Sequence, residues 1–143
     1  MSNEHLAALD EKGNLLSHGV SRSRAHREGV WHRTVSIIVL NRYGEILVEK
    51  RSRHQDLFPG FYDTPGGHVQ FGRGPDETAE EELLEELHLT PECRLIRLSE
   101  EDAVLERVIR PEKGLINLER KTVYIVEVTE SEEKAILRYG SEG

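Results

Sequence analysis

The alternation of hydrophobic and polar positions along the chain first indicates several β-strands. Residues 34–40 are rich in β-branched side chains and predict a buried strand. The turn residues 41–44 follow, so residues 45–51 predict the returning strand of a hairpin. Residues 121–128 have the same β-branched character and predict another strand. Shorter segments with strand character are residues 68–71 and 94–98.

One segment has the periodicity of an amphipathic helix. Ala79, Leu83 and Leu87 recur about one helical turn apart and form an apolar stripe. Pro75 suits the first helical position, and the acidic residues after it favour a helix N-terminus. The sequence therefore predicts a helix that ends at His88, a residue type that tolerates the left-handed conformation better than most.

The remaining segments have weaker patterns. Residues 1–30 are polar and predict an irregular N-terminal segment, whereas residues 99–116 fit either a helix or an irregular excursion. Residues 130–137 predict a short helix or turn. Strands, one helix and further strands are typical of a mixed α/β domain. The length of 143 residues fits a single domain that spans residues 1–143.

Charge and cysteine content narrow the possible partners. The net charge of −8 argues against binding a nucleic acid polymer, because phosphate neutralisation needs basic density. No apolar run approaches the ~18 residues of a membrane span, so no membrane partner is expected. Cys93 is the single cysteine, which rules out an internal disulfide and favours the cytoplasm. We expect Cys93 to be a small buried apolar side chain.

Three carboxylates share one side of the predicted helix. Glu82, Glu85 and Glu86 are spaced at i, i+3 and i+4, where like charges repel each other. No lysine or arginine lies between Pro75 and Leu89 to offset this repulsion. A hard cation such as Mg²⁺ or Mn²⁺ would turn the repulsion into ligation. The alternative is a solvated acidic face, which the helix alone does not exclude.

The loop before the helix favours the metal interpretation. Gly66 and Gly67 allow the backbone to approach a ligand closely, and a helix N-terminus favours phosphate. Gly67, Glu82, Glu85 and Glu86 with Leu89 beyond them resemble the box of the Nudix family, in which a glycine precedes Arg-Glu-apolar-any-Glu-Glu-any-Gly-apolar. The approach to the box also matches the family, in Lys50-Arg51-Ser52, Phe58-Pro59-Gly60-Phe61-Tyr62-Asp63 and Pro65-Gly66-Gly67-His68-Val69.

The resemblance implies a Nudix-like α/β/α sandwich with a mixed sheet, in which residues 66–89 form the box. It also implies a hydrolase that uses Mg²⁺ or Mn²⁺ to cleave a diphosphate linkage in a nucleoside-diphosphate-linked or related small molecule. Glu82, Glu85 and Glu86 would be the catalytic metal ligands. Arg51, Gly66, Gly67 and Phe61 would contact the phosphorylated substrate, although Arg51 can equally be a solvated charge and Phe61 a packing residue.

The box departs from the family pattern at three positions. Arg73 replaces its first glutamate, Glu81 replaces the arginine before Glu82, and His88 replaces the glycine near the helix end. The first two departures are opposite in sign, so we hypothesise that Arg73 and Glu81 form a charge-swapped ion pair. A box altered in this way leaves open a catalytically impaired fold that binds a nucleotide or a protein without turnover.

The N-terminal part is similar to a branch of the family related to isopentenyl-diphosphate isomerase. That resemblance implies a second metal site made by His26, His32 and His68 with Glu119, while the position of a further glutamate falls on Lys121. Histidine ligands suit a transition-type cation better than Mg²⁺. The alternative is that these histidines are structural or solvated.

Isomerase activity itself is the least favoured function. The isomerase needs a cysteine just before its Gly-His dipeptide, and Pro65 and Gly66 stand there in this chain.

The chain ends where the family usually has a second large helix. Residues 130–143 leave room only for a short helix, so the C-terminal helix is expected to be short or absent. An uncovered sheet face would be an apolar patch, which favours a homodimer.

Overall fold

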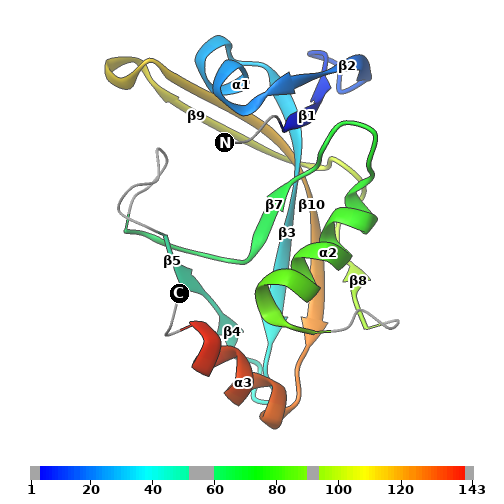
Figure 1. The fold of residues 1–143 in the computed structure, drawn as a ribbon, viewed down its shortest axis with the longest axis vertical. Coiled ribbons are helices and arrows are strands. Elements are labelled where there is room, and N and C mark those ends of the chain that lie inside the picture. The colour runs from blue at the N-terminus through cyan, green and yellow to red at the C-terminus, as the bar shows by residue number, and fades with distance from the viewer. Residues whose placement is uncertain (1–3, 52–59, 90–93, 141–143) are drawn as a thin grey trace.

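The structure is a computed structural model that describes residues 4–51, 60–89 and 94–140. The expectation for Cys93 and the family match at Phe58 lie outside the described residues. Figure 1 shows a central mixed sheet, with α1 (Arg22–Glu28) at one end of the molecule and α3 (Glu130–Gly140) at the other. None of the described helices combines the length and apolar character that a membrane crossing requires.

The N-terminal segment is ordered, so the prediction that residues 1–30 are irregular was wrong. β1 (His5–Leu9) and β2 (Leu15–Ser21) form an antiparallel hairpin that leads into α1. The turn between the strands is held by Asp10, whose Oδ1 accepts from the backbone nitrogens of Lys12 and Asn14, each at 2.9 Å. Residues 6–9 are all buried, because both faces of β1 are covered. A strand buried on both faces lacks the alternating pattern that sequence analysis relies on.

Two long strands form the centre of the sheet. β3 (Trp31–Leu40) and β10 (Leu115–Glu127) run parallel, with His32 opposite Glu119 and Leu40 opposite Glu127. On its other side β3 pairs with β1, β7 (Gly66–His68) and β4 (Ile46–Leu47). β10 pairs antiparallel with β9 (Val104–Arg110) and β8 (Ile96–Arg97). The mixed α/β fold with a mixed sheet is therefore confirmed.

Several boundaries differ from those predicted. The returning strand of the first hairpin divides into β4 and β5 (Glu49–Lys50), and β5 pairs with β6 (Tyr62–Asp63) in a small separate sheet. β7 begins two residues before the expected strand at 68–71. Within the ambiguous residues 99–116 lie β9 and the short 3-10 helix η1 (Pro111–Lys113).

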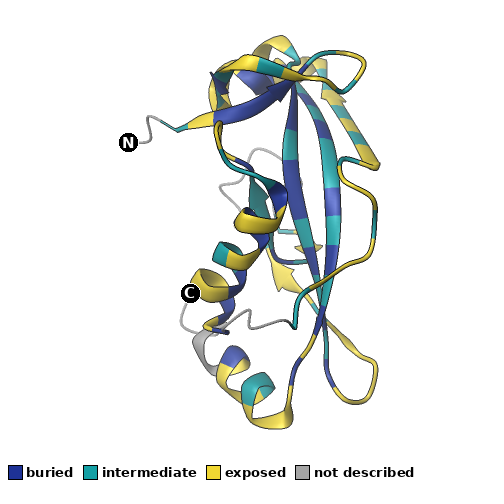
Figure 2. Cartoon of the chain, turned by 90° about the vertical axis from the view of Figure 1, so that its right-hand side faces the viewer, coloured by how far each residue is buried: buried dark blue, intermediate teal, exposed yellow. Residues whose placement is uncertain are grey.

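α2 (Pro75–Leu87) covers one face of the sheet, as its apolar stripe predicted. Ala79, Leu83 and Leu87 pack in one buried cluster with Val35 and Ile37 of β3. Figure 2 shows the exposed residues of α2 on its outer side. His88 ends the helix in the left-handed conformation with φ 58°. The C-terminal helix is short but present: α3 places Ile136 against the same buried cluster.

Strand alternation gives the sheet a second, polar face opposite α2. Val35 and Ile37 point into the core, so His32, Thr34 and Ser36 point to the other side. Because β10 and β7 are in register with β3, Glu119 and His68 share that side. The functional candidates therefore gather where β7 forms the edge of the sheet.

Candidate functional site

A cavity of about 500 Å³ lies beside β7 and reaches both faces of this strand. Glu86 of α2 lines one part of it, and His26 and His68 line another. Both basic and acidic groups line the wall, namely Arg22, Glu49, Lys50, Arg51, Asp63, Glu106, Glu119 and Lys121. Each of the two sets of metal-ligand candidates predicted from the sequence thus has members that border this cavity, namely Glu86 in one set and His26, His68 and Glu119 in the other.

Gly67 brings the acidic helix close to the sheet. A Cβ atom on residue 67 would lie 2.5 Å from Oε1 of Glu82, closer than real Cβ contacts allow. A Cβ atom on Gly66 would lie 2.2 Å from the carbonyl oxygen of Val35. Gly66 is therefore required by close packing against the backbone, whereas a side chain at residue 67 would displace the Glu82 carboxylate.

Burial makes the acidic side of the cavity electrostatically unfavourable without a cation. Burial and the neighbouring Glu82 carboxyl, to which Glu86 hydrogen bonds, together raise the pKa of Glu86 to about 8. Burial also raises the pKa of Glu82 and of Glu49 on β5. Glu85 lies on the exposed side of the helix and does not line the cavity. A divalent cation near Glu82 and Glu86 would offset this repulsion.

The other predicted substrate contacts lie on the strand and loop beside β5. Arg51 lines the cavity, and its Nη1 lies 3.3 Å from Oδ2 of Asp63. The backbone nitrogen of Arg51 donates to the carbonyl oxygen of Phe61 at 2.6 Å. The Phe61 side chain is 62% exposed, so it is available to a ligand but does not line the cavity.

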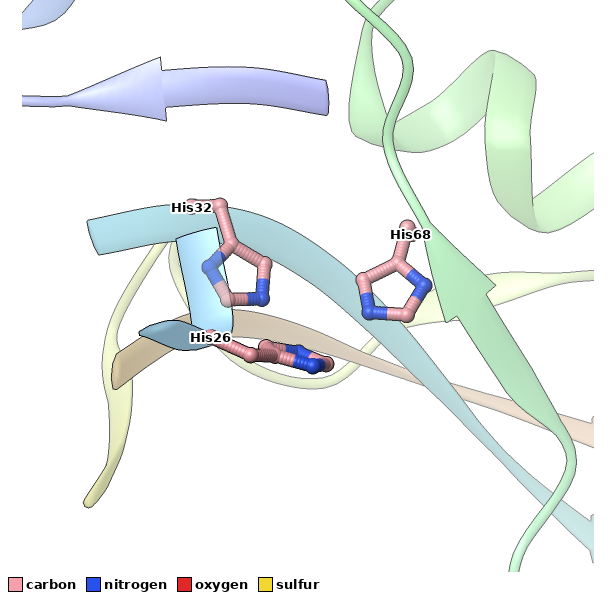
Figure 3. A group of neighbouring side chains, drawn as sticks. All are labelled: His26, His32 and His68. Atoms are coloured by element: carbon pink, nitrogen blue, oxygen red, sulfur yellow. The ribbon is translucent and has the colours of Figure 1, made fainter. Parts of the chain in front are cut away.

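Three histidines from separate elements converge on the polar face. His26 comes from α1, His32 from β3 and His68 from β7, and one nitrogen of each lies within 4.8 Å of the others. Figure 3 shows the three rings turned toward one another. Within the described residues this is the only group of three or more potential ligands with such spacing, so Glu82, Glu85 and Glu86 do not form one.

His32 has the geometry of a metal ligand. Its Nδ1 lies 2.9 Å from the carbonyl oxygen of Val30, and this contact requires the proton on Nδ1. Nε2 is then an acceptor, and it is buried without a hydrogen-bond partner among the described residues. Burial lowers the pKa of His32, and it lowers that of His68 to about 3, so both rings are neutral near pH 7. Neutral imidazoles with a fixed tautomer are what a transition-type cation requires.

Glu119 stands beside this cluster with its carboxylate held in place. Oε2 lies 3.9 Å from Nε2 of His32 and accepts from Nδ2 of Asn117 at 2.9 Å. Oε1 accepts from Oγ1 of Thr34 at 3.2 Å and lies 3.2 Å from Nζ of Lys121. Burial acts to raise the pKa of Glu119, but the positive charge of Lys121 and the hydrogen bond from Asn117 hold it at about 2. The carboxylate is therefore charged at every relevant pH.

Sequence analysis did not single out Glu49, Arg22, Asn117 or Glu106, although they border or support the cavity. A usable signal was present in β10, where Asn117, Glu119 and Lys121 occupy every second position. Such alternation places these side chains together on one face.

The hypothesised pair of Arg73 and Glu81 is present. Nη2 of Arg73 contacts Oε1 of Glu81 and lies 3.1 Å from Oε2 of Glu77. The Arg73 and Glu81 side chains therefore compensate each other in charge.

The fold and site together define a class of protein. It is a mixed-sheet α/β domain in which a carboxylate-bearing helix packs against a Gly-Gly edge strand. Residues 30–138 match the family model of the NUDIX domain, so the chain belongs to the Nudix family.

Two relatives indicate how far this similarity extends. An uncharacterized Nudix hydrolase of Yersinia pestis is 36% identical over 85 residues, which are 59% of this chain and 46% of that protein. Nudix hydrolase 3 of Arabidopsis thaliana is 28% identical over 131 residues, 90% of this chain and 17% of that protein. The chain thus spans less than half the length of either relative.

Solved structures support the fold. A Deinococcus radiodurans protein superposes with a TM-score of 0.64 at 23% identity, over 87% of this chain and 72% of that one. The dihydroneopterin triphosphate pyrophosphohydrolase of E. coli gives a TM-score of 0.51 at 14% identity, over 78% and 96% of the two chains.

Proposed function

We propose that this chain is a hydrolase that uses Mg²⁺ or Mn²⁺ to cleave a diphosphate linkage in a nucleoside-diphosphate-linked or related small molecule. The observation that carries the proposal is the pair Glu82 and Glu86, two carboxyls with raised pKa values beside Gly67 at the cavity. Membership of the Nudix family supports the reaction class.

The residues around the cavity have separate roles in this proposal. Glu82 and Glu86 would hold the cation, with Glu85 reaching it only if its exposed side chain turns toward the cavity, and a bound cation would supply charge neutralisation of the diphosphate and a lower pKa of the attacking water. Arg51 and the backbone of Gly66 and Gly67 orient the phosphates. The water oxygen forms a new bond to phosphorus as the bridging P–O bond breaks, and a carboxylate of the same helix accepts the water's proton.

The test is turnover of nucleotide-linked diphosphates by the pure protein in Mg²⁺ or Mn²⁺. Glu82→Gln and Glu86→Gln should each lower kcat by at least about a hundredfold, because each removes a charged group from the reacting centre. Glu80→Gln provides the matched control, since Glu80 is an exposed residue of the same helix outside the cavity. Full activity in both cavity variants would disprove this metal site.

A catalytically impaired binding module is the second candidate. The ion pair of Arg73 with Glu81 supports it, because Glu81 is then engaged at the helix rather than available near the cavity. Tight nucleotide binding in the same assay without product in either metal would favour this candidate over the hydrolase.

We also propose that His26, His32 and His68 bind a transition-type cation together with Glu119. The buried, unpartnered Nε2 of His32 supports this site, and the neutral imidazoles suit Zn²⁺ or Co²⁺. Metal titration monitored by Co²⁺ absorption should give one site per chain, and His32→Ala should abolish it. His18→Ala is the control, because His18 is exposed on β2. Retention of the Co²⁺ spectrum in His32→Ala would contradict the assignment.

A further inference from the structure

The polar face of β10 carries a lysine beside the proposed histidine site. Strand register places Lys121 opposite Thr34, two residues from Glu119 and on the same side of the sheet. Its Nζ lies 3.2 Å from Oε1 of Glu119 and 3.3 Å from Oε1 of Glu106 on β9. The Lys121 side chain is only 20% exposed, so its charge is poorly screened by solvent.

The two carboxylate oxygens of Glu119 therefore have different neighbours. Its Oε1 faces Lys121 and Thr34, whereas its Oε2 accepts from Nδ2 of Asn117 at 2.9 Å and lies 3.9 Å from Nε2 of His32. Two ligand atoms of one tetrahedral cation with bonds of ~2.1 Å lie about 3.4 Å apart. A small movement of Oε2 would bring Glu119 into the coordination sphere of a cation held by the histidines.

We infer that Lys121 is a positioning residue that weakens metal binding at the histidine site by competing for the carboxylate of Glu119. This inference rests on the proposed histidine metal site. The ammonium and the cation share one carboxylate in a poorly screened cavity, so each lowers the affinity of Glu119 for the other. Glu106 anchors the ammonium from the neighbouring strand, which keeps Lys121 beside Glu119 when the cation is absent.

The consequence is a site that exchanges its cation. Three histidines and a carboxylate without a paired lysine would form a closed set of four ligands, which is typical of structural sites. With Lys121 holding Oε1, Glu119 binds the cation less strongly, and a position that faces the cavity stays available to a ligand. Lys121 would thereby favour an exchangeable site over a purely structural one.

The test is the affinity of the full chain for Co²⁺ and Zn²⁺, measured by absorption and calorimetry without substrate. Lys121→Met should tighten binding by on the order of tenfold, because the competing charge is lost and the alkyl stem is kept. Lys113→Met is the control, since Lys113 is an exposed residue of η1 outside the cavity. It should change the affinity less than about twofold.

A double-mutant cycle separates competition for Glu119 from direct repulsion of the metal. In a Glu119→Gln background, Lys121→Met should give less than about a threefold gain, because the shared carboxylate is no longer there. An equal gain in both backgrounds, or no gain in Lys121→Met, would overturn the inference.

Two further observations keep the test decisive. Lys121→Arg retains the positive charge and should therefore reproduce the wild-type affinity for Co²⁺. This variant serves as the comparison if Lys121→Met unfolds. Tenfold tighter Co²⁺ binding by Lys121→Arg would count against competition by charge. Absence of Co²⁺ binding in both the wild type and Lys121→Met would remove the histidine site and this inference with it. Loss of diphosphate hydrolysis alone would leave the metal measurement, and therefore the inference, intact.

Discussion

Glu82 packs directly against Gly67, so the acidic helix and the edge strand approach each other as closely as their backbones allow. A Cβ atom on residue 67 would lie 2.5 Å from Oε1 and 2.8 Å from the carboxyl carbon of Glu82. Gly67 faces α2, whereas His68, the next residue, faces the opposite side of the sheet. One short strand therefore fixes the position of both proposed metal sites.

Gly67→Ala should disturb the acidic site first. The new methyl group would displace the Glu82 carboxylate, and because that carboxylate is the far end of a flexible side chain, the unfolding free energy should fall by less than about 1 kcal/mol. Turnover should fall more steeply than stability, because Glu82 would leave its metal-binding position. Gly74→Ala is the control: its φ is −105° and no atom lies within 4 Å of the added Cβ. Denaturant unfolding and kcat for both variants check the prediction, and a Gly67→Ala enzyme with wild-type kcat would contradict it.

The stability of the metal-free protein should depend on pH through Glu86. Its folded-state pKa of about 8 lies above the ordinary value of 4.5, so the folded state binds more protons than the unfolded state between these values. The contribution of Glu86 to the unfolding free energy therefore falls as pH rises from 4.5 to 8. Glu86→Gln should remove that part of the slope, and the difference between variant and wild type should grow with pH. The unfolding free energies of both proteins, measured by denaturant titration at pH 5 and pH 8, check this prediction. The same change in unfolding free energy between the two pH values in wild type and Glu86→Gln would contradict the raised pKa.

Charge reversal at the altered box is a separate prediction. Arg73→Glu should cost at most about 1 kcal/mol, because the Arg73 and Glu81 side chains are 33% and 41% exposed and their ion pair is screened. The double variant Arg73→Glu with Glu81→Arg should recover only part of that loss, because it re-forms one ion pair but leaves the new glutamate beside Glu77. Thermal unfolding of the two single variants and the double variant measures the coupling. Additive losses would show that the ion pair contributes nothing to stability.

The sequence predicted the fold best where one face of an element is apolar and the other is polar. Residues 75–88 were expected to be helical and α2 spans Pro75–Leu87, because the stripe of Ala79, Leu83 and Leu87 has a single interpretation. β1 was missed because Leu6 and Ala8 pack on one side and Ala7 on the other, so positions 6–9 are all apolar. Burial on both faces erases the period of a strand.

The site was predictable only in part, for a related reason. Glu82 and Glu86 are neighbours on one helix, so sequence spacing alone places them together. His26, His32 and His68 belong to three different elements, and only the resemblance to a family brought them together before the structure did. Lys121 and Glu106 meet through the register of β9 and β10, which no local pattern in the sequence specifies.

The homodimer expected from the sequence stays a prediction. Apolar side chains on and beside β8 and β9 are exposed, with Ile96 at 60%, Leu98 at 54% and Ile109 at 58%, and a second copy would cover such side chains. Sedimentation at micromolar concentration should therefore give twice the chain mass of 16.4 kDa. A folded monomer under these conditions would contradict the prediction.

Metal binding by the histidine cluster should resist mild acid. Histidines with an ordinary pKa near 6.5 lose affinity when protons compete with the metal, by about tenfold for each ring at pH 5.5. Burial lowers the pKa of His32 and, to about 3, that of His68, so these two rings stay neutral well below pH 6.5. Co²⁺ affinity should therefore fall between pH 7.5 and 5.5 by about a hundredfold less than for a set of solvent-exposed histidines. A peptide with the same number of histidines provides the reference, and an equally steep fall in the protein would show that its imidazoles titrate as they do in water.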